Sequence, residues 1–96
     1  MTSLELIKSR KKEILELADK YGVCNVRIFG SVARGEANGN SDIDILVDFK
    51  GKTSLFQLGG LWMELNDLLK VRTEVFTSGL LKENVKENAL REAIAL

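Results

Sequence analysis

The sequence predicts an α/β fold in which helices pack on a small mixed β-sheet. Segments with helical and with strand periodicity alternate along the chain. Only twelve residues, 30–41, join the first two predicted strands, and this length favours antiparallel neighbours because a parallel crossover needs a full helix. At 96 residues the chain is long enough for one independent core, so we expect a single domain over residues 1–96.

The amino-terminal half is expected to hold one helix and two strands. Apolar residues at helical spacing predict an amphipathic helix over residues 3–20. β-branched and aromatic residues then predict strands over residues 23–29 and 43–49. The link between the strands has room for only a turn or two of helix, and its polar residues 38–41 predict a turn.

The next predicted helix, over residues 54–69, carries an unusual pair of glycines. Gly59 and Gly60 each cost a helix up to about 1 kcal/mol relative to alanine, so the pair marks a kink or the close approach of another backbone. The notch that Gly59 and Gly60 leave in the helix surface lies near Trp62 and Met63. These residues form an interface, or they belong to an apolar stripe that is buried in the hydrophobic core.

The carboxy-terminal part of the chain predicts a third strand and a closing helix. Residues 71–76 have strand composition, and residues 79–95 have helical periodicity. The residues of this helix that we expect to be buried are Leu80, Leu81, Val85, Leu90 and Ile94.

The composition favours chemistry at sites whose metal ligands are oxygen atoms. With 14 basic and 14 acidic residues the net charge is zero, which argues against a general nucleic-acid binder. The single Cys24 excludes an intrachain disulfide and a multi-cysteine zinc site, and we expect it to be a small apolar filler. The absence of histidine removes a His-based nucleophile triad and the commonest transition-metal ligand. The sequence has no apolar signal core at its start and no membrane-spanning run, so we expect a cytoplasmic protein.

A Gly-Ser pair follows the first predicted strand and is a candidate phosphate site. Gly30 would let a ligand approach the backbone closely, and Ser31 can cap the following helical turn and offer its hydroxyl to a phosphate. The alternative is a tight turn with an N-cap and no ligand. Arg34 can reach a phosphate from the same link, or it forms a solvated ion pair with Glu36.

Two aspartates at the start of the second predicted strand are candidate metal ligands. Side chains alternate across a strand, so Asp42 and Asp44 share a face roughly 6 to 7 Å apart at the backbone. Like charges at that separation repel unless a cation lies between them. The pair matches magnesium-dependent phosphoryl or nucleotidyl transfer. In the alternative, Ser41-Asp42 caps a turn and Asp44 faces solvent.

Two-metal sites usually have a third carboxylate on a neighbouring strand, which also accepts the proton of the attacking hydroxyl. Glu74 is the one candidate inside the third predicted strand. The alternative for Glu74 is a surface pair with Arg72. Asp48 shares the face of the two aspartates, but we expect it to lie beyond the metals and to be solvated.

Together these pieces resemble the minimal nucleotidyltransferase domains of the DNA polymerase β superfamily. The string GSVARGEANGNSDIDILVDF fits that family in residue type and spacing, and TSGLLKENVKENALREAIAL is similar to its closing loop and helix. The resemblance implies a nucleotidyltransferase fold like the polymerase β palm. It implies that Gly30 and Ser31 hold a nucleotide triphosphate, and that the catalytic residues Asp42, Asp44 and Glu74 hold two Mg²⁺ ions.

The third acidic position departs from the family, which usually has aspartate there. The extra methylene of Glu74 moves its carboxylate by roughly an ångström, and a misplacement of that order can cost about a hundredfold in rate. A strand that recedes from the site would compensate for the longer side chain.

The resemblance also implies a partner. Small members of the family are typically encoded beside a HEPN-domain toxin, and as antitoxins they can transfer AMP from ATP to a tyrosine of that toxin and silence its RNase activity. A chain with no room for a substrate domain agrees with such a macromolecular acceptor. The leading hypothesis is therefore a magnesium-dependent protein adenylyltransferase antitoxin. The alternative is an inactive antitoxin that acts by binding alone. A third hypothesis, transfer to RNA ends or to a small molecule, is disfavoured by the neutral charge and the single domain.

Overall fold

The structure is a computed structural model that describes residues 2–36 and 42–96. The predicted turn at residues 38–41 lies outside the described residues. Along the described chain the elements are α1 (Ser3–Ser9), α2 (Lys11–Lys20), β1 (Val23–Phe29), α3 (Gly30–Arg34), β2 (Ile43–Phe49), α4 (Leu55–Leu69), β3 (Thr73–Thr77), the 3₁₀ turn η1 (Ser78–Leu80), α5 (Glu83–Glu92) and β4 (Ile94–Ala95).

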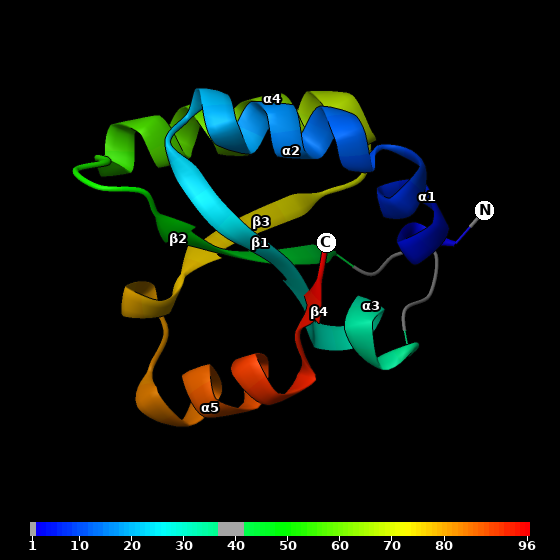
Figure 1. Ribbon diagram of the computed structural model, residues 1–96. Coiled ribbons are helices and arrows are strands. Elements are labelled where there is room, and N and C mark those ends of the chain that lie inside the picture. Colours follow the sequence, from blue (N-terminus) through cyan, green and yellow to red (C-terminus); the bar gives the residue numbers. More distant parts are fainter. Residues whose placement is uncertain (1, 37–41) are drawn as a thin grey trace.

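Four strands form one mixed sheet in the order β3-β2-β1-β4. β1 runs antiparallel to β2 and to β4, while β2 and β3 are parallel. Helices α2 and α4 lie side by side on one face of the sheet, and α5 covers the other face (Figure 1). The predicted α/β class and the antiparallel pairing of the first two strands are both confirmed.

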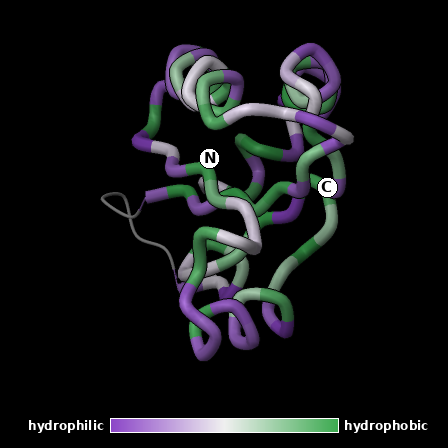
Figure 2. Tube along the Cα trace, turned by 90° about the vertical axis from the view of Figure 1, so that its left-hand side faces the viewer, coloured by the Kyte–Doolittle hydropathy of each residue, from purple (hydrophilic) through white to green (hydrophobic). Residues whose placement is uncertain are grey.

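Alternating side chains of the strands supply two cores, one on each face of the sheet. Ile45 belongs to the larger core beneath α2 and α4, whereas its neighbour Leu46 packs with Phe29 and Ala89 in a smaller core beneath α5. Hydrophobic segments run through the middle layer, and hydrophilic segments are frequent on the outer turns of the helices (Figure 2). No helix in the described ranges is long and apolar enough to cross a bilayer.

The single helix predicted for residues 3–20 is wrong, because the chain forms two helices there. Arg10 leaves the helical region, with φ of −109° and ψ of 15°, and separates α1 from α2. The break turns α1 toward α3, where Ile7 is fully buried. Tertiary packing of Ile7 therefore overrides the continuous periodicity.

The carboxy-terminal prediction also needs correction. Instead of one helix over residues 79–95, the chain forms η1, the shorter α5 and the strand β4, which pairs with β1. Because α5 begins at Glu83, its phase differs from the predicted one and Ala89 is the buried residue. The expected core positions Leu80, Val85, Leu90 and Ile94 are all exposed, and Leu81 is partly buried.

The third strand begins at Thr73, two residues later than predicted, and a side chain of α4 fixes that start. Asn66 Oδ1 accepts a hydrogen bond of 2.9 Å from the Thr73 N–H, and Asn66 Nδ2 donates to the Thr73 carbonyl at 2.9 Å. The amide of Asn66 therefore pairs with the backbone of Thr73 as a neighbouring strand would. These two hydrogen bonds fix the position of the next residue, Glu74, along β3.

Candidate functional site

Strand register gathers the sequence motifs at one end of the sheet. The parallel pairing of β2 with β3 sets Asp44 opposite Glu74, and the antiparallel pairing of β1 with β2 sets Asp44 opposite Phe29. Phe29 directly precedes Gly30, so Asp44 has Glu74 on one side and the first turn of α3 on the other. Asp42 lies two residues before Asp44 and on the same face.

Gly30 is the point where the backbone packs directly against Asp44. Its φ of +75° lies in the left-handed region that side chains other than glycine rarely adopt. A Cβ at this position would overlap the Oδ2 atom of Asp44. Gly30 therefore allows the start of α3 to pack against the Asp44 carboxylate, and the predicted approach of a ligand to Gly30 stays a prediction.

Ser31 does not have the capping position that was predicted for it. Phe29 is the N-cap of α3 and makes no side-chain cap, and Ser31 lies inside the first turn and is partly buried. The helix begins two residues earlier than a cap at Ser31 implies, because its first residue is Gly30. The phosphate-binding role of Ser31 stays a prediction.

The electrostatics of the site centre on Asp44. Burial raises the pKa of its carboxyl above the ordinary value, and the charges of Asp42 and Glu74 raise this pKa further. Arg34 acts in the opposite direction and lowers the pKa of Asp44. A partly desolvated carboxylate beside two others favours the arrival of a cation.

Arg72 lies between two of the three acidic residues. Its Nε is 3.3 Å from Glu74 Oε1 and 3.7 Å from Asp42 Oδ2. The alternative of an Arg72–Glu74 surface pair is thus realised in this structure, and the pair extends to Asp42. The Arg72 side chain is 75% exposed, and an ion pair at such a site is worth at most about 1 kcal/mol. A divalent cation can therefore displace the guanidinium at small cost.

The donor atoms fit a hard divalent cation, although the described part of the chain contains no preformed cluster. Asp42, Asp44 and Glu74 offer carboxylate oxygens, which are the ligands that Mg²⁺ prefers. Among residues 2–36 and 42–96, no three His, Cys, Asp or Glu side chains are arranged closely enough to hold a metal ion. Arg72 holds two of these three carboxylates, those of Asp42 and Glu74, in ion pairs.

Arg34 is held by two glutamates, of which the sequence indicated only one. Its Nε is 2.9 Å from Glu36 Oε2, as expected, and its Nη1 is 2.9 Å from Glu92 Oε2 at the end of α5. These hydrogen bonds raise the pKa of Arg34 above its ordinary value, with Glu36 contributing most. Glu92 could not be found from sequence because it is 58 residues away and carries no local signal.

Asp48 is not solvated as expected, because β1 supplies two partners for it. Asn25 Nδ2 donates a 3.0 Å hydrogen bond to Asp48 Oδ2. Arg27 Nη2 lies 3.0 Å from Asp48 Oδ1 as an ion pair without hydrogen-bond geometry. A β-bulge between Cys24 and Arg27 brings these side chains to Asp48, which lies outside the acidic site as predicted.

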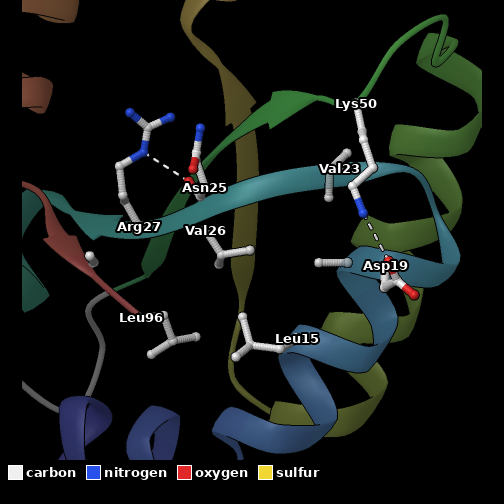
Figure 3. A pocket seen from close by; sticks show the side chains of 10 residues that line it. Leu15, Asp19, Val23, Asn25, Val26, Arg27, Lys50 and Leu96 are labelled. Carbon is white, nitrogen blue, oxygen red and sulfur yellow. Dashed lines mark hydrogen bonds and ion pairs between the residues drawn. The ribbon is translucent and has the colours of Figure 1, made fainter.

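Two hollows on the surface differ in their relation to the acidic residues. A groove of about 580 Å³ between α2, β1 and the carboxy terminus is lined by residues such as Leu15, Val26 and Leu96 (Figure 3), and none of Asp42, Asp44 and Glu74 lines it. A smaller hollow of about 250 Å³ includes Glu74 and Val75 of β3 together with four residues of α4. Only the second of these adjoins the candidate site.

Known proteins that are similar in sequence to this chain are described as nucleotidyltransferases or adenylyltransferases. Residues 9–96 match the family model of the nucleotidyltransferase domain. Protein adenylyltransferase MntA from Thermococcus cleftensis is 39% identical, over 98% of this chain and 96% of its own length. A relative from Methanocaldococcus jannaschii, provisionally described as a protein adenylyltransferase, is 39% identical over 92% of this chain and 95% of its own.

Solved structures agree with the fold. One that is provisionally described as a minimal nucleotidyltransferase has a TM-score of 0.88 and 40% identity, and the match covers 100% of this chain and 97% of that one. A chain of a toxin-antitoxin complex with AMP-PNP has a TM-score of 0.74 and covers 88% of this chain and 70% of that one. At 18% identity this second likeness concerns the fold alone.

Proposed function

This chain belongs to the nucleotidyltransferase domain family and is a nucleotidyltransferase, and from that premise we propose that it is a protein adenylyltransferase that acts as an antitoxin in the cytoplasm. It transfers AMP from ATP to a tyrosine hydroxyl of a HEPN-domain toxin encoded by a neighbouring gene. The name of the Thermococcus cleftensis relative supports the reaction, and the toxin-antitoxin neighbour supports the biological setting.

The observation that carries the proposal is the register that sets Asp44 opposite Glu74 while Gly30 packs against Asp44. Carboxylates from two strands beside a helix-opening glycine are the arrangement that nucleotidyl transfer needs. When bound, two Mg²⁺ ions would neutralise phosphate charge and align the attacking and leaving oxygens. Asp42 and Asp44 would hold them from β2, and Glu74 would hold one from β3.

The reaction is a displacement at the α-phosphorus of ATP. The acceptor hydroxyl oxygen forms a bond to this phosphorus, the bond from the phosphorus to the bridging oxygen breaks, and pyrophosphate leaves. Glu74 accepts the hydroxyl proton, because it is the carboxylate on the exposed edge strand where a partner can approach. The result is a phosphodiester between AMP and the acceptor.

Residues of the first motif hold the triphosphate. The absence of a side chain at Gly30 lets the Asp44 carboxylate pack against the start of α3, and the Ser31 hydroxyl donates to a phosphate oxygen. Arg34 contributes positive charge, and its salt bridges to Glu36 and Glu92 fix its direction before the nucleotide arrives.

A second candidate function is neutralisation of the toxin by binding alone. It is favoured by one specific observation, which is that Arg72 already pairs with Asp42 and Glu74. If the cation never displaced Arg72, the three carboxylates would have a structural role only. The chain would then cover the active site of its partner without modifying it.

Labelling of the partner distinguishes the two functions. The protein is incubated with labelled ATP, Mg²⁺ and the HEPN-domain protein encoded beside it, and the partner should become labelled. The double variant Asp42→Asn, Asp44→Asn should give no label and should no longer protect cells from the toxin. Equal labelling by the double variant refutes the transferase proposal, and undiminished protection by it favours neutralisation by binding.

A further inference from the structure

Helix α4 exposes a band of apolar side chains that the fold does not use. The α4 surface consists of Leu55, Phe56, Gly59, Trp62 and Met63. Phe56 is 91% exposed, Leu55 63%, Met63 62% and Trp62 43%. Their spacing of three, four and seven residues puts them on one side of the helix. No charged residue occurs between positions 55 and 63, although 29% of the whole chain is charged.

The two adjacent glycines of α4 have different environments. A Cβ on Gly60 would overlap the ring of Tyr21, so the packing of α2 against α4 explains that glycine. A Cβ on Gly59 would meet nothing within 4 Å. Glycine inside a helix costs stability relative to alanine, and none of the described residues lies close enough to the Cβ position of Gly59 to require a glycine there. The notch at Gly59 therefore suits a molecule that comes close to the helix from outside.

The α4 surface reaches the candidate catalytic site at the edge of the sheet, where Val75 packs toward α4 and Glu74 lies on the opposite face with Asp44. Leu55, Gly59 and Trp62 line the 250 Å³ hollow whose other wall includes Glu74 and Val75 of β3. β3 is the edge strand of the sheet and packs against α4 (Figure 1), so among the described residues no further strand separates this hollow from solvent. Asn66 holds the two walls together, because it donates to the Trp62 carbonyl at 2.8 Å and also pairs with Thr73.

We propose that the α4 surface is the docking site of the acceptor protein, and that an apolar helix of this partner crosses α4 over Gly59. The inference rests on the proposed function, because the acceptor hydroxyl must be held beside Glu74 and the α4 surface is an apolar area that reaches this residue at the edge of the sheet. The apolar side chains of the α4 surface are one and two helical turns apart, with Gly59 between them. This arrangement is typical of a surface that binds a helix. A second copy of this chain seated there would instead cover the hollow at Glu74.

The substitution Gly59→Arg tests the docking site because it fills the notch without disturbing the fold. The open space at Gly59 admits a side chain, and Gly79 offers a matched control that is also exposed, with nothing within 4 Å of its Cβ position. Gly79 lies beyond the far end of β3 from Glu74. Binding of the neighbouring HEPN-domain protein is measured by calorimetry without ATP or divalent cations, so that no chemistry contributes.

We expect Gly59→Arg to weaken binding by about tenfold or more, as is typical when the centre of an interface is blocked. Phe56→Ser should do the same by removal of an anchor, and Gly79→Arg should bind like the wild type. Wild-type affinity of Gly59→Arg and Phe56→Ser, or no binding by the wild type, overturns the proposal. So does a wild-type dimer in sedimentation that Gly59→Arg converts to monomer. Binding without labelling contradicts only the proposed function, and labelling that is insensitive to Gly59→Arg contradicts only the docking site.

Discussion

Replacement of Gly30 by alanine tests whether the contact between the first motif and Asp44 matters for transfer. Two penalties are expected from the structure. The φ of +75° is unfavourable for alanine, at a cost of roughly 1 to 2 kcal/mol. The added Cβ also overlaps the Asp44 carboxylate, so this side chain or the start of α3 must move.

A second glycine separates the two penalties. Gly51 has a φ of +68°, and its Cβ position has nothing within 4 Å, so Gly51→Ala carries the backbone penalty without the overlap. Both variants should therefore lower the melting temperature, by roughly 4 to 8 °C per kcal/mol for a domain of this size. Only Gly30→Ala should lose transfer activity, by about a hundredfold, which is the loss expected when a catalytic group moves by about 1 Å.

The assay combines thermal denaturation with the initial rate of partner labelling at a temperature where both variants are folded. If Gly30→Ala transfers AMP as fast as Gly51→Ala, then the position of Asp44 against α3 is irrelevant to catalysis. The reasoning from the Gly30 contact would then be wrong, whatever the two melting temperatures are.

Three further predictions concern the same edge of the sheet. Arg72→Gln removes the guanidinium from Asp42 and Glu74. The variant should therefore bind Mn²⁺ up to about fivefold more tightly than the wild type in titrations without nucleotide. An unchanged affinity would show that Arg72 does not compete with the cation. The pKa of Asp44 is raised in the folded state. At pH values just above the ordinary pKa of aspartate, the folded protein therefore binds more protons than the unfolded chain. The metal-free protein should lose stability as the pH rises through this range. Asp44→Asn should therefore melt higher than wild type at pH 7 in chelator and show no gain near pH 3, and a lower melting point at pH 7 would contradict this sign. Asn66→Ala leaves the Thr73 backbone without its partners and should lower the free energy of unfolding in urea by about 1 to 3 kcal/mol; a loss below 0.5 kcal/mol would mean that water replaces the amide.

The central strands and the acidic motif could be predicted because their signals are local. β1 and β2 have the predicted bounds, since a run of β-branched and aromatic residues starts and stops at residues typical of turns. The short link between them predicted their antiparallel pairing. The two-residue spacing of Asp42 and Asp44 fixed their common face once β2 was recognised.

The features that sequence could not supply depend on contacts between distant segments. The break at Arg10 follows from the packing of Ile7 against α3, and β4 exists because the carboxy terminus reaches β1. The same holds for the partners of Arg34 and Asp48, since Glu92 and Arg27 approach only in the folded chain. The intrusion of Arg72 between Asp42 and Glu74 likewise requires β2 and β3 to pair in register.

Intact mass measurement of the partner after incubation with ATP and Mg²⁺ is the most direct test of the central claim, which is that Glu74 and the two aspartates together carry out adenylyl transfer. The wild type should add one adenylyl group to a tyrosine of the HEPN-domain protein, and Glu74→Gln should add none. Glu83→Gln makes the same change at an exposed position of α5 and should behave like the wild type. Equal modification by Glu74→Gln would contradict the account.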